Sequence, residues 1–527
     1  MTKVKANSEN ISKNFIIGFG ILVLILGFLI EKEVSLPQPV TLSVAVVGGT
    51  VLLISSFFNA EIPLYALAAY VPFNRVLSGN FGRAMTALNL TNFLCIVAIL
   101  GYIGRATRGK EPPHKSALNL PIFLFAVIGA VSFIRGGLEY GEWYFTRFLI
   151  PLKRWLTPLL LYFITLFIVK DRRTLKTVVV ILMFAVTVAG LMAVKDYMDV
   201  GTVGSIEKER VGGIAEQPNM LAAFFCYYMF LFGSFYLCNA SKPKYWLLLI
   251  PFLICFRGIQ VTFSRGGYLA FFTGAFALSF FRSKILFVLT IVLLIIGIMN
   301  PILLPGGIVY RLRSTFVHTE EMETADLEAA APDTYKGEAV VLEGSSRGRL
   351  VIWKGALKMI ADHPFWGIGY GTFTALIPYY APELRGMRMD AHNSYLIIAA
   401  EMGIPALLIF LWILGVAIWK THWLYRHARE PFHRALALGF LAGLFALLMA
   451  NMFGSRMHSE EISGYFWILC GLIVKAIYFE KEAKPLPVSA VSKGKNRKNG
   501  AEAEPVTPQS LSARLSKFDA SKYGEDR

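Results

Sequence analysis

Long apolar runs recur along this chain, separated by short polar connections. A helix needs about 20 apolar residues to cross the hydrocarbon core of a bilayer, so we interpret each run as a membrane-spanning helix. The pattern predicts an all-α integral membrane protein with about 12–14 spans. The runs cover residues 15–30, 40–58, 61–77, 86–103, 119–134, 150–169, 175–194, 220–238, 245–263, 266–281, 285–301, 393–419, 434–454 and 462–479.

The connections between these runs alternate in charge. Cytoplasmic loops of membrane proteins carry an excess of Lys and Arg. If the basic N-terminus is cytoplasmic, every second connection should be basic, and this holds, for example at Arg105–Lys115 and Lys170–Lys176. The alternation predicts cytoplasmic N- and C-termini. It assigns the remaining long connections to the outer face, namely residues 195–219, 257–265, 302–391 and 455–461.

One polar insertion, residues 302–391, interrupts the apolar pattern. Its first half is rich in Pro and Gly and then acidic, which is typical of irregular chain. Leu350, Trp353, Leu357 and Ile360 then recur at three- and four-residue spacing, which predicts a surface helix of about residues 346–362 that ends before Pro364.

These observations divide the chain into four parts. Residues 1–301 are expected to form a bundle of about eleven spans, and residues 302–391 a periplasmic loop with the surface helix. Residues 392–479 hold three further spans. The charged tail at 480–527 is punctuated by prolines, and its composition favours disorder.

Composition excludes an ordinary soluble protein, because 55% of the residues are hydrophobic and only 17% are charged. Soluble domains carry about a quarter charged residues. A net charge of +17 would suggest a nucleic-acid partner in a soluble chain. Here the basic residues lie between apolar runs, so we expect membrane lipids as partners and no nucleic acid. The five cysteines lie in apolar stretches and are expected to be buried thiols, not metal ligands or disulfides.

Four polar features fall on the predicted outer face. Arginine offers a planar fork of donors that fits phosphate oxygens, and histidine is suited to take a proton from a hydroxyl group. An interfacial arginine often only anchors a helix, and a histidine at a helix start often only packs or caps. Arg265 stands out because the following glycines allow close backbone approach. The four features are Arg210 with Asn219; Ser264-Arg265-Gly266-Gly267; Arg347 and Arg349 with Trp353; and His392-Asn393 with Tyr395.

Several of these motifs stand in an order that resembles the shared domain of bacterial O-antigen ligases and polymerases. The resemblance covers roughly residues 205–415 and begins with Pro218-Asn219 and Ser264-Arg265-Gly266-Gly267. It continues with Ser345-Ser346-Arg347-Gly348-Arg349-Leu350, Trp353, Asp362-His363-Pro364, Gly367-Ile368-Gly369-Tyr370-Gly371, His392-Asn393-Ser394-Tyr395-Leu396 and Glu401-Met402-Gly403.

The resemblance implies a glycosyltransferase of the inner membrane that needs no metal or other cofactor and acts at the periplasmic face. Its donor would be a glycan on undecaprenyl diphosphate, and its acceptor a hydroxyl group of a lipid or glycan. Carried over to this chain, His392 would be the catalytic base. Arg265 and Arg349, then Arg210 and Arg347, would bind the diphosphate, with Asn393, Tyr395, Trp353 and Asn219 in support.

The acceptor stays open at this point. Ligation to lipid A core, polymerisation of lipid-linked repeats and protein O-glycosylation all fit the same residues. Transport of an anionic lipid or polysaccharide is the alternative from another class, and it would predict charged residues at mid-span and an internal repeat. The sequence shows few such charges and no evident repeat. It does not indicate an oligomeric state.

Overall fold

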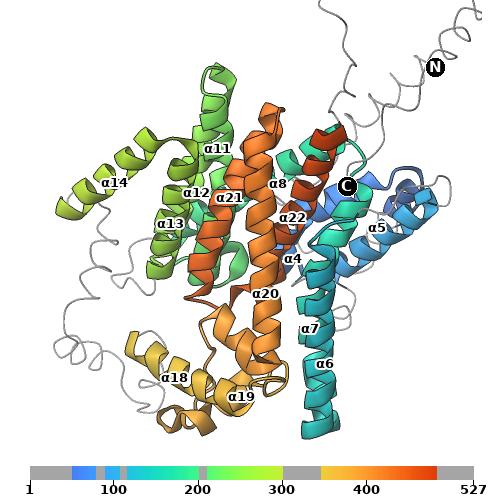
Figure 1. The fold of residues 1–527 in the computed structure, drawn as a ribbon, viewed down its shortest axis with the longest axis vertical. Coiled ribbons are helices and arrows are strands. Elements are labelled where there is room, and N and C mark those ends of the chain that lie inside the picture. Colours follow the sequence, from blue (N-terminus) through green and yellow to red (C-terminus); the bar gives the residue numbers. More distant parts are fainter. Residues whose placement is uncertain (1–49, 79–88, 107–114, 201–209, 301–345, 483–527) are drawn as a thin grey trace, which may run out of the picture. The chain divides into compact units, whose positions relative to one another are not determined.

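The computed structural model of the protein describes residues 50–78, 89–106, 115–200, 210–300 and 346–482. The predicted span 15–30, the acidic stretch of the long loop and the charged tail lie outside these residues. Every regular element within the described ranges is a helix, which confirms the predicted all-α class (Figure 1). The chain divides into a unit of residues 1–482 and a second unit of residues 483–527.

The helices fall into two groups along the chain, one before residue 301 and one after residue 345. The first group comprises α3 (Glu61–Tyr70), α4 (Asn74–Ser78), α5 (Leu90–Ala106), α6 (Asn119–Tyr140), α7 (Glu142–Ile168), α8 (Arg172–Val200), α10 (Pro218–Tyr228), α11 (Phe230–Cys238), α12 (Leu249–Gln260), α13 (Arg265–Arg282) and α14 (Lys284–Met299). The second comprises α18 (Ser346–Asp362), α19 (Phe373–Tyr380), α20 (Ser394–His427), α21 (Pro431–Asn451) and α22 (Glu460–Glu482), with the short 3₁₀ turn η7 (Arg456–His458) between the last two.

Among the described residues, seven helical segments are long and apolar enough to cross a membrane, counting α10 and α11 as one segment, Pro218–Cys238. The others are α6, α7, α8, α20, α21 and α22, and each overlaps a span predicted from the sequence. Helices α5 and α14 are apolar but shorter. The predicted helix of residues 346–362 is present as α18, with the same bounds.

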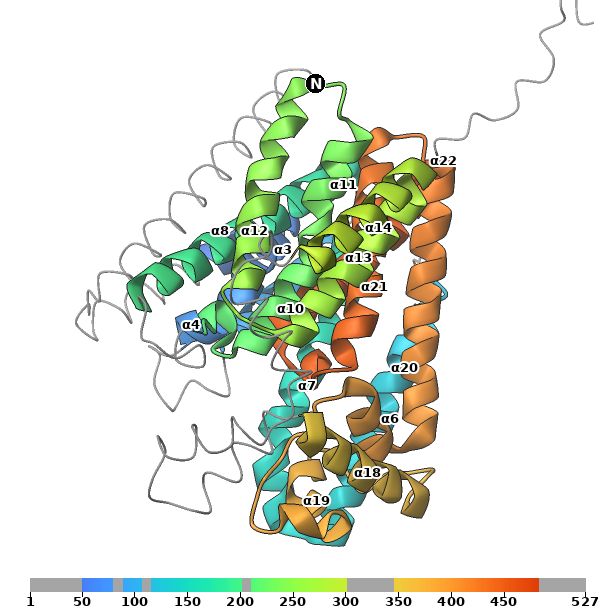
Figure 2. The ribbon, with the colours of Figure 1, turned by 90° about the vertical axis from the view of Figure 1, so that its left-hand side faces the viewer.

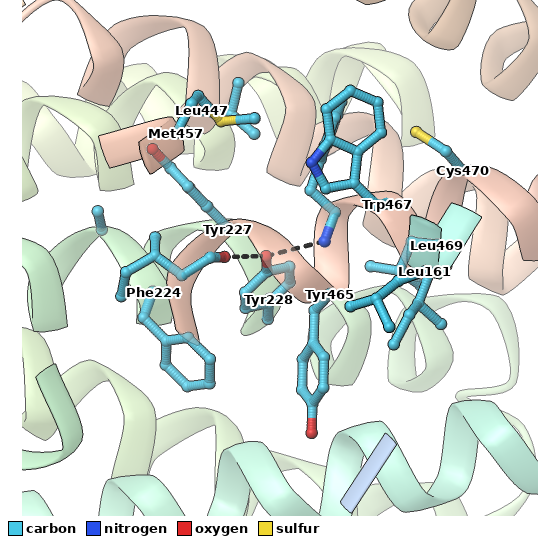
Figure 3. Packing of buried hydrophobic residues seen from close by; sticks show 14 of the residues in the cluster. Leu161, Phe224, Tyr227, Tyr228, Leu447, Met457, Tyr465, Trp467, Leu469 and Cys470 are labelled. Atoms are coloured by element: carbon cyan, nitrogen blue, oxygen red, sulfur yellow. Dashed lines mark hydrogen bonds between the residues drawn. The ribbon is translucent and has the colours of Figure 1, made fainter. Parts of the chain in front are cut away.

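Helix α22 lies deep inside the bundle, and 94% of the residues in its most apolar stretch are buried. Figure 3 shows the aromatic residues through which α22 packs against α10. The Tyr228 hydroxyl donates to the Ile462 carbonyl at 2.5 Å and accepts from the Phe466 N–H at 3.0 Å. The Tyr228 and Tyr465 rings pack edge to face at 5.4 Å. Buried hydroxyl groups need such partners, so these bonds fix the contact between the two helices.

Helix α20 is broken near its start, at Gly403, where φ is 86° and ψ is 168°. At the break, backbone N–H and C=O groups of α20 lose their partners within the helix and must pair with another segment of the protein. The loop after α18 supplies the partners: Ile404 N–H donates to the Pro364 carbonyl, and Ile368 N–H donates to the Ala400 carbonyl at 2.8 Å. The loop carrying α18 and α19 is thereby joined to this end of α20, as Figure 2 shows.

Candidate functional site

Several helix ends meet around the start of α20. Helices α10, α13, α20 and α22 begin there, and α12 and α21 end there. The hydrogen bonds and close contacts described below link the ends of α10, α12, α13, α20 and α21. Helix starts leave backbone N–H groups unpaired and carry a partial positive charge, so their convergence favours an anionic ligand.

Arg210 is anchored on the side of this group formed by α10 and α12. Its Nε donates to the Thr262 carbonyl at 3.0 Å, and its Nη2 donates to Asn219 Oδ1 at 2.9 Å. Asn219 is the second residue of α10. Asn219 thus holds the Arg210 side chain in place, and its predicted supporting role in the site stays a prediction.

Arg265 is the first residue of α13. The hydroxyl of Ser264 caps this helix by accepting from the Gly267 N–H at 3.2 Å. A Cβ on Gly267 would lie 2.7 Å from the Ala222 Cβ, and a Cβ on Gly266 would lie 3.1 Å from the Phe453 Cβ. The two glycines let the start of α13 approach α10 and the chain after α21, which sets the position of Arg265.

Arg349 lies in the first turns of α18 and is partly buried. Its Nε is shielded from solvent and has no hydrogen-bond partner among the described residues. Arg347 belongs to the same helix, but its side chain lies outside the described part of the structure. The predicted role of Arg347 therefore stays a prediction.

A fourth arginine, Arg456, lies at the centre of the group and is 1% exposed. Its Nη1 donates to the Asn219 carbonyl at 2.5 Å, and its backbone N–H donates to Ser394 Oγ at 3.0 Å. It thus connects α10 with the first residue of α20. A Cβ on Gly454 would lie 2.4 Å from Arg456 Nε, so the side chain needs glycine at that position.

The other three guanidinium groups are close enough to Arg349 to act on it. Burial lowers the pKa of Arg349, and three neighbouring positive charges lower it further. These charges belong to Arg265, Arg456 and Arg210. Like charges repel, so a cluster of this kind stabilises a bound anion and is destabilising when empty. The structure brings together Arg210, Arg265 and Arg349, and their predicted role as diphosphate ligands remains a prediction.

His392 lies two residues before α20, with its side chain 14% exposed. Its φ of 47° is in the left-handed region, which is unusual for a residue other than glycine. Asp390 Oδ2 accepts from the His392 N–H at 3.1 Å and lies 3.6 Å from Nδ1. A carboxylate in this place holds the imidazole ring and stabilises its protonated form, as a general base requires.

The three remaining predicted residues are engaged in the fold. Asn393 caps α20, since its side-chain oxygen accepts from the Tyr395 N–H at 2.9 Å and the Leu396 N–H at 3.1 Å. The Tyr395 hydroxyl donates to the Leu448 carbonyl in α21 at 3.0 Å. Trp353 Nε1 donates to the Ala391 carbonyl at 3.0 Å, which links α18 to the segment of His392. These contacts support the site by positioning it.

Sequence reasoning assigned no role in the site to Asp390, Arg456 or His458. One signal was available: residues 455–461 were assigned to the same face as the other candidates, and this connection carries Arg456 and His458. A short loop between two apolar runs does not reveal which of its side chains is buried. From the sequence alone, Arg456 is therefore indistinguishable from an arginine that only anchors a helix at the membrane interface.

A separate polar group lies beyond the other end of α20. Glu430, His433 and Glu480 have ligand atoms within 4.8 Å of one another and are the one such group, among described residues, that could hold a metal ion. Lys176 and Arg172 already pair with Glu430, and His433 Nδ1 lies 2.8 Å from Glu480 Oε1. These interactions are those of a structural ion-pair network joining α8, α21 and α22.

Comparison with known proteins identifies one domain in this part of the chain. Residues 250–411 match the family model described as O-antigen ligase. No curated protein matches the chain. The matched segment contains Arg265, Arg349 and His392, while Arg210 and Arg456 flank it in sequence and meet it in space. Residues 250–411 therefore form an O-antigen ligase domain within a multi-pass membrane protein, and this domain supports O-antigen ligase-like glycan transfer in general.

Proposed function

We propose that this protein transfers a glycan from undecaprenyl diphosphate to an acceptor hydroxyl group at the periplasmic face of the inner membrane. The observation that carries the proposal is the cluster of Arg210, Arg265, Arg349 and Arg456, gathered from four separate segments. A diphosphate supplies the anionic oxygens that such a cluster lacks on its own. His392 and Asp390 lie in the segment that Trp353 ties to the same α18 helix.

The proposed reaction is a single displacement at the first sugar. His392 takes the proton from the acceptor hydroxyl, whose oxygen attacks C1 of that sugar. The bond between C1 and the diphosphate oxygen breaks, and its electron pair leaves with the lipid diphosphate. The arginines offset the charge that grows on this leaving group, which is where preorganised donors lower the barrier most. The proton on His392 is then released to water.

The nature of the acceptor separates the two leading forms of this activity. A ligase would attach finished polysaccharide to the lipid A core, and a polymerase would join lipid-linked repeats. Deletion of the gene distinguishes them when surface polysaccharide is separated on a gel. Free polymer that is no longer attached identifies a ligase, and single repeats identify a polymerase. An unchanged pattern would contradict both.

Complementation of the deletion then tests the residues. We expect that Arg265→Ala and His392→Ala fail to restore the polysaccharide while the protein accumulates normally in the membrane. Gly415→Ala is the matched control, because a Cβ there meets no atom within 4 Å, and it should restore the wild-type pattern. Full activity of Arg265→Ala or His392→Ala would remove that residue from the mechanism.

A further inference from the structure

The turn between α21 and α22 holds buried polar atoms that the fold does not use. Ser455 Oγ, Arg456 Nε and both ring nitrogens of His458 are shielded from solvent and lack a hydrogen-bond partner among the described residues. Nearly all buried polar groups in folded proteins are paired. Unpaired atoms concentrated in one short turn therefore indicate a ligand or bound water that completes them.

His458 is the member of this turn that the charge of Asp390, the partner of the candidate base, reaches. Its ring lies 6.4 Å from the Tyr370 ring, and the Tyr370 hydroxyl is already committed to the Pro151 carbonyl at 3.2 Å. The negative charge of Asp390 reaches His458, and the same carboxylate lies 3.6 Å from His392 Nδ1. Asp390 is thus near both imidazole rings.

We propose that His458 hydrogen-bonds a sugar hydroxyl group of the lipid-linked donor, beside His392; this inference rests on the proposed function. A hydroxyl group both donates and accepts, and a neutral imidazole offers one donor and one acceptor. Burial lowers the pKa of His458, which keeps the ring neutral and suited to this pairing.

The position beside His458 and the proposed diphosphate position differ in the charge of the residues around them. The arginine cluster attracts anions, whereas the Asp390 carboxylate repels them. A donor with an anionic diphosphate and neutral sugars fits both parts at once, with the diphosphate on the arginines and the sugar beside Asp390 and His458. A second anionic group in the position of the sugar would not fit.

The test compares binding of two probes to the purified full-length protein. One probe is undecaprenyl diphosphate, and the other is the lipid-linked glycan extracted from cells that lack this protein. His458→Phe keeps a flat ring against Tyr370 but removes both nitrogens. We expect it to weaken binding of the glycan-bearing lipid on the order of tenfold, the loss of about one buried hydrogen bond, and to leave binding of undecaprenyl diphosphate unchanged.

Three further variants sharpen the result. His458→Gln keeps a donor and an acceptor and should recover most of the lost affinity. His458→Leu replaces His458→Phe if the latter does not purify as a single species. His427→Leu removes an exposed histidine at the far end of α20 and should bind both probes normally.

Two outcomes would overturn the inference alone. Equal weakening of both probes by His458→Phe would mean that the residue only shapes the site, and no weakening of either would mean that water completes it. Failure of the unaltered protein to bind either lipid, or to transfer glycan, would instead overturn the proposed function and this inference with it.

Discussion

At the scale of single residues, the site contains residues in unfavourable states. Arg349 is surrounded by like charges, and His392 has a left-handed backbone conformation. His392 holds a left-handed backbone conformation, which costs about 1 kcal/mol for a residue other than glycine. Asp390 accepts from the His392 N–H and thereby stabilises this conformation. The same carboxylate lies beside the imidazole, so Asp390 stabilises both the backbone conformation of His392 and the position of its ring.

The first prediction concerns Asp390. Asp390→Asn keeps the size of the side chain but removes the negative charge that stabilises protonated His392. We expect kcat to fall roughly 10²-fold with little change in KM, which is within the range for impaired general acid–base catalysis. Initial rates with purified protein and extracted donor measure this. An Asp390→Asn enzyme with wild-type kcat would show that the contact of 3.6 Å has no catalytic use.

The second prediction concerns Arg349, whose neighbours repel it in the empty site. Arg349→Gln should leave the thermal stability of the ligand-free protein unchanged or raise it, because one of several like charges is lost. It should also weaken donor binding by roughly 1.5–3 kcal/mol, the usual contribution of a charged hydrogen bond.

Thermal unfolding in detergent, with and without undecaprenyl diphosphate, measures both effects of Arg349→Gln. The stabilisation by ligand should shrink although the baseline does not fall. Lys354→Gln is the control, since it removes a positive charge from the same helix. A fall in ligand-free stability with normal ligand binding would mean that Arg349 serves the fold only.

At the scale of elements, the break in α20 was not predictable from the apolar pattern. The apolar run continues past Gly403 although Glu401 and Pro405 flank it, and hydrophobicity alone cannot show that the backbone leaves the helix there. The three glycines at 367, 369 and 371 all have positive φ, which is a local signal for a turn. What the sequence could not reveal is that this turn pairs with the broken helix.

Helix α18 shows the opposite case. Its apolar residues recur at helical spacing and Pro364 follows it, so both ends were predictable from local signals. Arg349 could be assigned to the start of this helix for the same reason. Its proximity to Arg210 and Arg456 depends on contacts between distant segments, which no local pattern encodes.

The third prediction concerns the break itself. A Cβ at Gly403 would lie 2.2 Å from the Phe365 carbonyl oxygen, and its φ of 86° also disfavours other residues. Gly403→Ala should therefore destabilise the protein by more than about 2 kcal/mol and separate the loop of α18 from α20. Gly415→Ala in the same helix has open space and should be nearly neutral. Melting temperatures of the two variants in one detergent decide the matter, and equal values would contradict it.

At the scale of the whole molecule, the seven long apolar segments establish an integral membrane protein. Which side of the membrane carries His392 is a prediction from the distribution of basic residues. The two ends of α20 offer suitable positions for a test, because Glu383 is exposed near the start of α20 and Arg426 is exposed near its end.

The fourth prediction places these two ends on opposite sides. Four of the five native cysteines are buried, so a Cys238→Ser background should react little with a polar thiol reagent. In intact spheroplasts, Glu383→Cys should be labelled and Arg426→Cys should be protected until the membrane is opened. The reverse pattern would put the site in the cytoplasm and exclude a periplasmic donor.

The burial of α22 has a consequence for how the molecule is made. The helix surrounded on nearly all sides follows all the other described helices in the chain, so it leaves the ribosome after them. The helices made before α22 must therefore stay in the bilayer without the central helix against which they pack. During that time the Tyr228 hydroxyl lacks its partners in α22, the Ile462 carbonyl and the Phe466 N–H. Nascent chains stopped before residue 460 should be targets for membrane proteases, and assembly of the arginine cluster should be among the final steps of biogenesis.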